Sequence, residues 1–153
     1  MARKTRVAFL IGDYPAEEHK RRADVALSYA TDEIEVGLVQ VSTTAYNRGN
    51  SPAELQLVAP AFIDAFRRAE AEGYDAAVPL GTLDLAVDAA RSCVDIPIIG
   101  PAEAMLHLGC MLGQRFGVLV YSHTSLVLCR RIVKQYGMTD RIVGWKVSGF
   151  HLP

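Results

Sequence analysis

Short apolar runs alternate with longer amphipathic segments along the whole chain, and this alternation constrains the fold more than any other feature. Helix-length segments between strand-length runs are typical of helices that cross between parallel strands. The sequence therefore predicts an α/β protein with a parallel sheet. Six strands are expected, at residues 7–11, 34–41, 76–80, 96–99, 116–121 and 142–147.

The first two helices have recognisable start signals. One helix is expected over residues 15–30, where small apolar residues repeat at helical spacing. The next begins with Ser51-Pro52-Ala53-Glu54, which fits a capping box with proline at the first helical position. Pro60 lies inside this helix and predicts a kink or a break near Ala59, because proline removes a backbone donor.

Three further helices follow in the second half. Asp84 or Thr82 is expected to cap a short third helix. The fourth, over residues 101–112, is apolar nearly all round and is predicted to pack on several sides. The fifth is expected over about residues 125–136.

Composition and charge exclude several classes of protein. Half of the 153 residues are apolar and 22% are charged, which argues against disorder, and the net charge of −1 gives no basic face for nucleic acid. The early apolar run from Val7 stops at Gly12, too short for a membrane span or a signal peptide, so a cytoplasmic protein without membrane contact is expected. The cysteines, Cys93, Cys110 and Cys129, match no zinc or disulfide spacing, so no metal is expected.

The ends of the predicted strands are the candidate ligand site, because parallel sheets bind ligands outside the carboxyl ends of their strands. These ends are rich in small, hydroxylated and turn-forming residues, which suit a small carboxylate ligand. An alternative is that they only cap helices and form turns. A long loop after the second strand adds an arginine that can hold a carboxylate. The candidate binding residues are Gly12, Asp13, Thr43, Arg48, Gly81, Thr82, Tyr121, Ser122, His123 and Thr124.

Common cofactor and hydrolase motifs are missing from the sequence. There is no glycine-rich dinucleotide fingerprint after the first strand, no Walker lysine pattern, no Gly-x-Ser-x-Gly and no HExxH. No cofactor is therefore expected. None of the three cysteines falls at a predicted strand end, where a thiolate is stabilised, so packing roles are favoured for all three.

Four segments carry a family resemblance: residues 87–91 (VDAAR), 94–97 (VDIP), 100–104 (GPAEA) and 115–118 (RFGV). Together they resemble the aspartate/glutamate/hydantoin racemase family, and most closely its hydantoin racemase branch. The resemblance implies two flavodoxin-like α/β domains with helices on both sheet faces, facing each other across a cleft. Residues 1–99 would form the first domain and residues 100–153 an incomplete second one.

The resemblance also implies a cofactor-independent mechanism in which two cysteines exchange the proton next to a carbonyl group. Alignment back from Asp95 places the first family cysteine at Gly81, and the second is expected beyond Pro153. No catalytic residue is therefore assigned in this chain.

Three functions remain open. The first is a racemase or isomerase of amino acids or their derivatives, of hydantoin, aspartate or glutamate type, with decarboxylases and maleate isomerases as related possibilities. The second is a non-catalytic domain that binds a small carboxylate or amino-acid-derived ligand, or a protein partner, on the same scaffold. The third is an incomplete fragment whose exposed sheet edge favours a homo-oligomer or aggregation.

Overall fold

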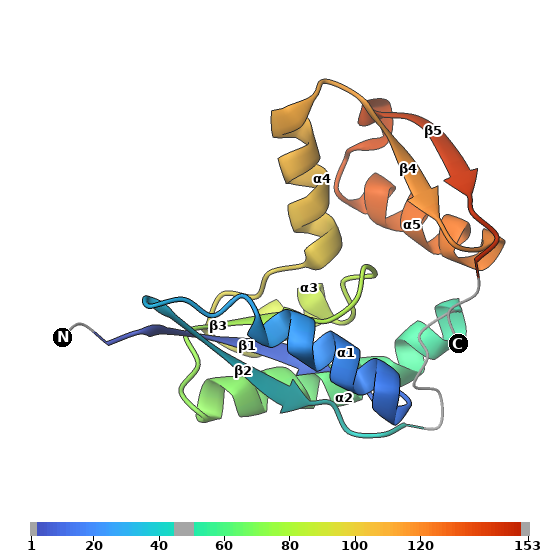
Figure 1. The fold of residues 1–153 in the computed structure, drawn as a ribbon. Coiled ribbons are helices and arrows are strands. Elements are labelled where there is room, and N and C mark those ends of the chain that lie inside the picture. Colours follow the sequence, from blue (N-terminus) through green and yellow to red (C-terminus); the bar gives the residue numbers. More distant parts are fainter. Residues whose placement is uncertain (1–2, 45–50, 151–153) are drawn as a thin grey trace.

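The structure is a computed structural model that describes residues 3–44 and 51–150, and it confirms an α/β architecture with parallel sheets (Figure 1). None of the helices in these ranges is long and apolar enough to cross a membrane. The elements in chain order are β1 (Thr5–Ile11), α1 (Ala16–Leu27), β2 (Ile34–Gln40), α2 (Pro52–Ala71), β3 (Ala76–Pro79), α3 (Val87–Arg91), α4 (Pro101–Leu112), β4 (Phe116–Val120), α5 (His123–Gln135), the 3-10 turn η1 (Thr139–Arg141) and β5 (Ile142–Val147).

The first sheet has the order β2-β1-β3, with β1 parallel to both neighbours. Helix α1 covers one face, and α2 with α3 covers the other (Figure 1). Ala8 and Leu10 on β1 point to the same face of the sheet and are fully buried in the apolar cluster with α2. One continuous apolar cluster joins this sheet to α2 and α3, and its last member along the chain is Ile98.

The second sheet contains β4 and β5, paired in parallel across the connecting helix α5. Its buried apolar side chains lie outside the apolar cluster of the first sheet. Residues 3–99 are called the N-terminal part below, and residues 100–150 the C-terminal part. The buried apolar side chains of the C-terminal part are Ala102, Leu106, Val120, Leu128 and Val133.

The strand predicted at residues 96–99 does not form, so this prediction is wrong. Only an isolated parallel bridge between Ala77 and Ile98 forms there, through Ala77 N–H to Pro97 O and Ile99 N–H to Ala77 O, at 3.0 Å each. The next bond in such a ladder would need an N–H from Pro79, and proline has none. A proline on the partner strand therefore ends the pairing after one bridge.

Of the kink or break expected near Ala59, the break is absent, since α2 runs without interruption from Pro52 to Ala71. Pro60 and Gln56, whose carbonyl loses its partner, are both exposed, so water can satisfy that carbonyl. The start of the helix is as predicted, because the Ser51 side chain accepts a hydrogen bond from Glu54 N–H at 3.2 Å.

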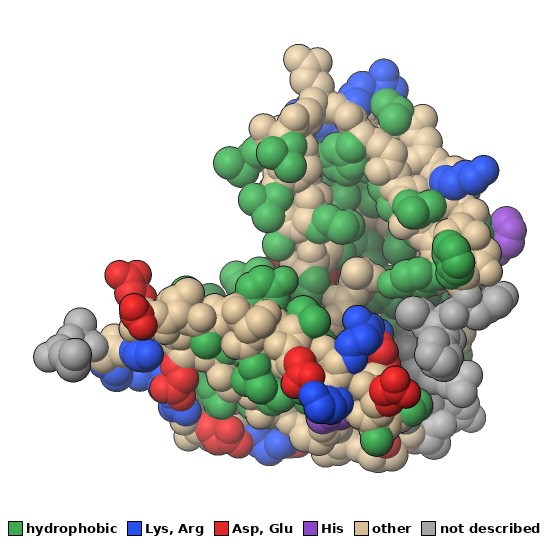
Figure 2. Space-filling model, viewed as in Figure 1, with side chains coloured by type: hydrophobic (Ala, Val, Ile, Leu, Met, Phe, Trp, Pro, Cys, Tyr) green, Lys and Arg blue, Asp and Glu red, His purple; other side chains and the backbone are tan. Residues whose placement is uncertain are grey.

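Helix α4 differs most from expectation, because it is not packed on several sides. Ala102 and Leu106 are buried, whereas the side chains along its other face are exposed. Figure 2 shows hydrophobic side chains spread over the surface of the C-terminal part. The sheet of the C-terminal part has two strands, and one edge of β4 pairs with no described strand. Too little of the described chain therefore surrounds α4 to bury it. The exposed apolar residues on α4 are Met105, Leu108, Met111 and Leu112.

Candidate ligand-binding cleft

The candidate site lies where the strand order of the first sheet reverses. The chain moves from β1 to β2 on one side and returns to β3 on the other, so the loops after β1 and β3 leave the sheet toward opposite faces. Such a switch point leaves a crevice at the carboxyl ends of the two strands. A cavity of about 1390 Å³ opens there, with Asp13 and Tyr14 after β1 and Gly81 and Thr82 after β3 on its wall.

The opposite wall belongs to the C-terminal part. It contains Tyr121 at the end of β4, Ser125 and Cys129 on α5, and the apolar face of α4 with Met105. In Figure 2 this cavity is the hollow between the lower and upper parts of the molecule. Typical sites for small ligands measure roughly 300–1,000 Å³. This cavity is larger because it includes the uncovered surfaces of α4 and β4.

The residues predicted from the strand ends are only partly brought together. Asp13, Gly81, Thr82 and Tyr121 line the cavity. Thr43 is not in the lining but donates from its hydroxyl to Asp13 Oδ2 at 2.8 Å, which ties the ends of β1 and β2 together.

The other candidates are not on the wall. Ser122 caps α5 by accepting from Ser125 N–H at 3.1 Å, and His123 and Thr124 are exposed on the first turn of that helix. Gly12 is also outside the lining, and Arg48 lies outside the described residues. Capping thus explains Ser122 without any ligand.

Gly81 has an unusual backbone. Its φ angle is +132°, and a Cβ atom added there would meet no atom within 4 Å. Space is therefore available for a side chain, but L-residues rarely adopt this φ. A cysteine at position 81 would project into open space only at the cost of backbone strain or a changed loop conformation.

Three residues that the sequence analysis did not select form a charged cluster on the cleft wall. Glu18 and Arg22 lie one turn apart on the same face of α1, and Tyr14 precedes the helix, next to its cap residue Pro15. The Arg22 guanidinium stacks over the Tyr14 ring at 4.3 Å and donates through Nε to Glu18 Oε1 at 2.6 Å. The spacing of four residues from Tyr14 to Glu18 and from Glu18 to Arg22, just after the first strand, is the sequence signal that could have identified this cluster.

The charges in this cluster leave part of the Arg22 guanidinium available to a ligand. Hydrogen bonds from Arg21 and then Arg22 lower the pKa of Glu18 to about 2, so it is ionised at neutral pH. Arg22 uses only Nε for Glu18, and its two terminal amino groups have no hydrogen-bond partner among the described residues. They can form a paired contact with a carboxylate or a ring carbonyl.

The thiols are placed poorly for proton transfer. Cys93, Cys110 and Cys129 are free and partly buried, and only Cys129 lines the cavity. It lies inside α5, and burial raises the pKa of its thiol, which disfavours the thiolate. Within residues 3–44 and 51–150, no group of three or more His, Cys, Asp or Glu side chains is arranged to hold a metal ion.

A parallel α/β scaffold with a cleft between two sheets defines a class of small-ligand proteins that bind at strand ends. Comparison of the sequence narrows this class, because the profile of the Asp/Glu/hydantoin racemase family matches residues 25–151. The chain belongs to the Asp/Glu/hydantoin racemase family.

Individual relatives agree with this assignment. A hydantoin racemase from Pseudomonas sp. (strain NS671) is 33% identical over 89 residues, which are 58% of this chain and 36% of the relative. Allantoin racemase from Klebsiella pneumoniae has the same fold, with a TM-score of 0.84, 20% identity, and coverage of 94% of this chain and 58% of the other. Allantoin racemase from Pseudomonas fluorescens gives a TM-score of 0.82 at 19% identity, covering 95% and 61%. The chain thus spans less than two thirds of the length of these relatives.

Proposed function

We propose that the cleft binds a small amino-acid-derived ligand with a carboxylate or a ring carbonyl, of the hydantoin type. One observation carries the proposal: Asp13 after β1 and Gly81 after β3 open into a single cavity at the switch point of the sheet. The names of the relatives, hydantoin racemase and allantoin racemase, supply the ligand class. A cytoplasmic location, cofactor independence and a domain boundary after residue 99 are parts of the same proposal.

The lining suits such a ligand. The terminal amino groups of Arg22, which have no hydrogen-bond partner in residues 3–44 and 51–150, would hold the carboxylate or carbonyl oxygen, as Arg48 was expected to do. Apolar side chains from both parts, including Leu83 and Met105, would accept a hydrophobic substituent. The site therefore combines one cationic contact with apolar walls, as small-molecule sites usually do.

We infer that this chain by itself binds without exchanging the α-proton. A racemase-type reaction removes the proton from one face and returns it from the other, so it needs two correctly placed acid–base groups. Gly81 has no side chain to serve as one of them, and Cys129 is a poorly ionised thiol on a helix.

Racemisation by this chain is the second candidate function, and the match of the racemase family to residues 25–151 favours it. In that case another side chain on the cleft wall must act as the base. The ionised Glu18 is not suited to this, because a carboxylate with a pKa of about 2 is a weak base.

Isothermal titration with 5-substituted hydantoins and acidic amino acids, paired with proton exchange in D₂O, separates the two functions. We expect saturable binding and no α-deuteration above a protein-free control. Arg22→Gln should weaken binding by about tenfold or more, because a hydrogen bond to a charged group contributes roughly 1.5–3 kcal/mol. Arg131→Gln, an exposed change on α5 away from the lining, is the matched control and should leave binding unchanged.

Each outcome has a consequence. Enzyme-dependent α-deuteration would establish racemase-type chemistry and overturn the inference that the chain only binds. Absence of saturable binding for every compound would overturn the proposed ligand class.

A further inference from the structure

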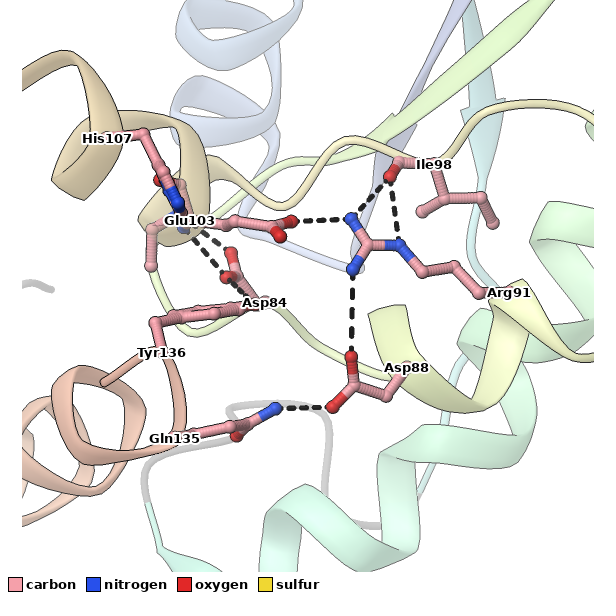
Figure 3. Close-up of polar contacts among 9 residues, drawn as sticks. Asp84, Asp88, Arg91, Ile98, Glu103, His107, Gln135 and Tyr136 are labelled. Carbon is pink, nitrogen blue, oxygen red and sulfur yellow. Dashed lines mark hydrogen bonds and ion pairs between the residues drawn. The ribbon is translucent and has the colours of Figure 1, made fainter. Parts of the chain in front are cut away.

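One carboxylate joins the two parts of the molecule. Asp84, on the loop that carries Gly81, accepts the Tyr136 hydroxyl at 2.7 Å and the backbone N–H groups of Ala102 and Glu103 at 2.7 and 3.0 Å (Figure 3). We propose that Asp84 is a positioning residue that fixes the Gly81 loop against α4 and α5 and so sets the width of the cleft. The proposal deepens the proposed function, and the part concerning ligand binding rests on it.

Asp84 serves α4 instead of the helix next to it in sequence. Asp84 or Thr82 was expected to cap α3, but that helix begins after Ala86 without a side-chain cap, and the Asp84 carboxylate instead binds the first turn of α4. A carboxylate is favourable at this position because of the free N–H groups and the helix dipole. The cap therefore connects the N-terminal part to the first helix of the C-terminal part.

The local backbone is arranged for this contact at some energetic cost. Asp84 and Ala86 have φ angles of +47° and +57°, which are uncommon for residues other than glycine. At Gly100, an added Cβ would lie 2.7 Å from Asp84 Oδ2, so only glycine permits the approach without a shift. Strain of this kind persists only where surrounding contacts enforce it.

Other polar contacts surround the junction but hold it less firmly. Arg91 on α3 binds the Glu103 carboxylate and donates to Ile98 O at 2.9 Å, and Gln135 donates to Asp88. Several of these side chains are exposed, and exposed ion pairs contribute little. Asp84 and Tyr136 are partly buried, so their bond is better protected from water.

The Tyr136 bond is well placed to control the cleft. Helix α5 lines the cavity through Cys129 and Ile132, and Tyr136 follows one turn after Ile132. Burial, together with the bond to Asp84, raises the pKa of Tyr136, so its hydroxyl remains a donor at neutral pH. One bond therefore connects the Gly81 loop of one wall to the helix of the other.

The test is the distance between the two walls, measured by pulsed electron spin resonance. Keto amino acids at Lys20 on α1 and Arg131 on α5, both exposed, carry the spin labels and leave the native cysteines in place. Tyr136→Phe removes only the hydroxyl and should broaden the distance distribution. Gln135→Ala, which removes the exposed link to Asp88, should not.

Substitutions of Asp84 give a graded series. Asp84→Ala should broaden the distribution most and should reduce hydrogen-exchange protection of the Ala102 and Glu103 amides by about 3- to 10-fold, the size expected for the loss of a net hydrogen bond. Asp84→Asn keeps one acceptor oxygen and should fall between wild type and Asp84→Ala.

A local capping role alone would change the amide protection but not the wall distance. An unchanged distribution in Tyr136→Phe would therefore overturn the proposal, and this variant decides the matter if Asp84→Ala fails to fold. Hydantoin affinity measured on Tyr136→Phe should fall by about threefold, near the low end of the effect expected for the loss of one net hydrogen bond. The distance measurement needs no ligand, so a failure of the proposed function leaves its result interpretable.

Discussion

Replacing Gly81 with alanine tests the conformation of the cleft wall. With φ at +132° and no atom within 4 Å of the added Cβ, the change introduces backbone strain and no steric clash. Such strain costs about 1–3 kcal/mol. For a chain of 153 residues, 1 kcal/mol corresponds to a Tm shift of roughly 2–4 °C, so Gly81→Ala should lower Tm by roughly 2–12 °C.

Gly144→Ala on β5 is the matched control. An added Cβ also meets no atom within 4 Å there, but the backbone does not have a left-handed φ. Alanine at a compatible position stabilises by about 0.4–1 kcal/mol by restricting the unfolded chain. Calorimetry of both variants should therefore give Tm changes of opposite sign. Equal changes would contradict this expectation, since the backbone conformation assigned to Gly81 would then have no energetic consequence.

Three further predictions concern stability and are measured by urea unfolding. Leu106→Ala should lower the free energy of unfolding by about 2–5 kcal/mol, because the side chain is buried. Leu112→Gln should change it by no more than about 0.5 kcal/mol, because Leu112 is 91% exposed. Similar losses at both sites would contradict the packing of α4. Gly37→Ala should lower the free energy of unfolding by about 1–3 kcal/mol, because the new Cβ would lie 2.0 Å from the Tyr74 hydroxyl and the ring would have to move. A neutral effect would argue against this contact. The pKa of the Glu18 carboxylate is lowered from 4.5 to about 2, so its stabilising effect is present above pH 4.5 and is lost as the pH falls toward 2. Glu18→Gln should therefore flatten the pH dependence of the free energy of unfolding between these two pH values. An unchanged slope would contradict the ion-pair assignment.

Much of the fold could be predicted because the information is local. Strand β5 matches its predicted bounds, and β1, β2, β3 and β4 agree to within one or two residues, since short apolar runs between amphipathic helices leave few alternatives. Ser51 was correctly predicted as a cap because its partner, Glu54 N–H, lies three residues away.

The fold prediction is wrong where the residue that decides the local structure lies far away in the sequence. Strand pairing at Ile98 ends because of Pro79, and nothing in residues 96–99 indicates this. Asp84 caps a helix that starts 17 residues later instead of the one directly following it. The exposure of α4 likewise depends on what surrounds the helix, which its own periodicity does not report.

The residues of the candidate site were also predicted only in part. Asp13, Gly81 and Tyr121 were selected because the carboxyl ends of parallel strands meet at one edge, and the structure places all three on the cleft wall. Ser122 was selected by the same rule but caps a helix, because strand ends and helix starts favour the same residue types. Arg22 was missed because its ion pair with Glu18 also fits an ordinary solvated helix face.

Amide chemical-shift mapping by NMR shows where on the protein a ligand binds and does not require turnover. On titration with a 5-substituted hydantoin, the largest saturable shifts should fall on Asp13, Gly81, Thr82 and Tyr121, around the cleft wall. Shifts confined to exposed residues outside the cavity lining, such as Met111 on α4 and Arg131 on α5, or no saturable shifts at all, would contradict binding in the cleft.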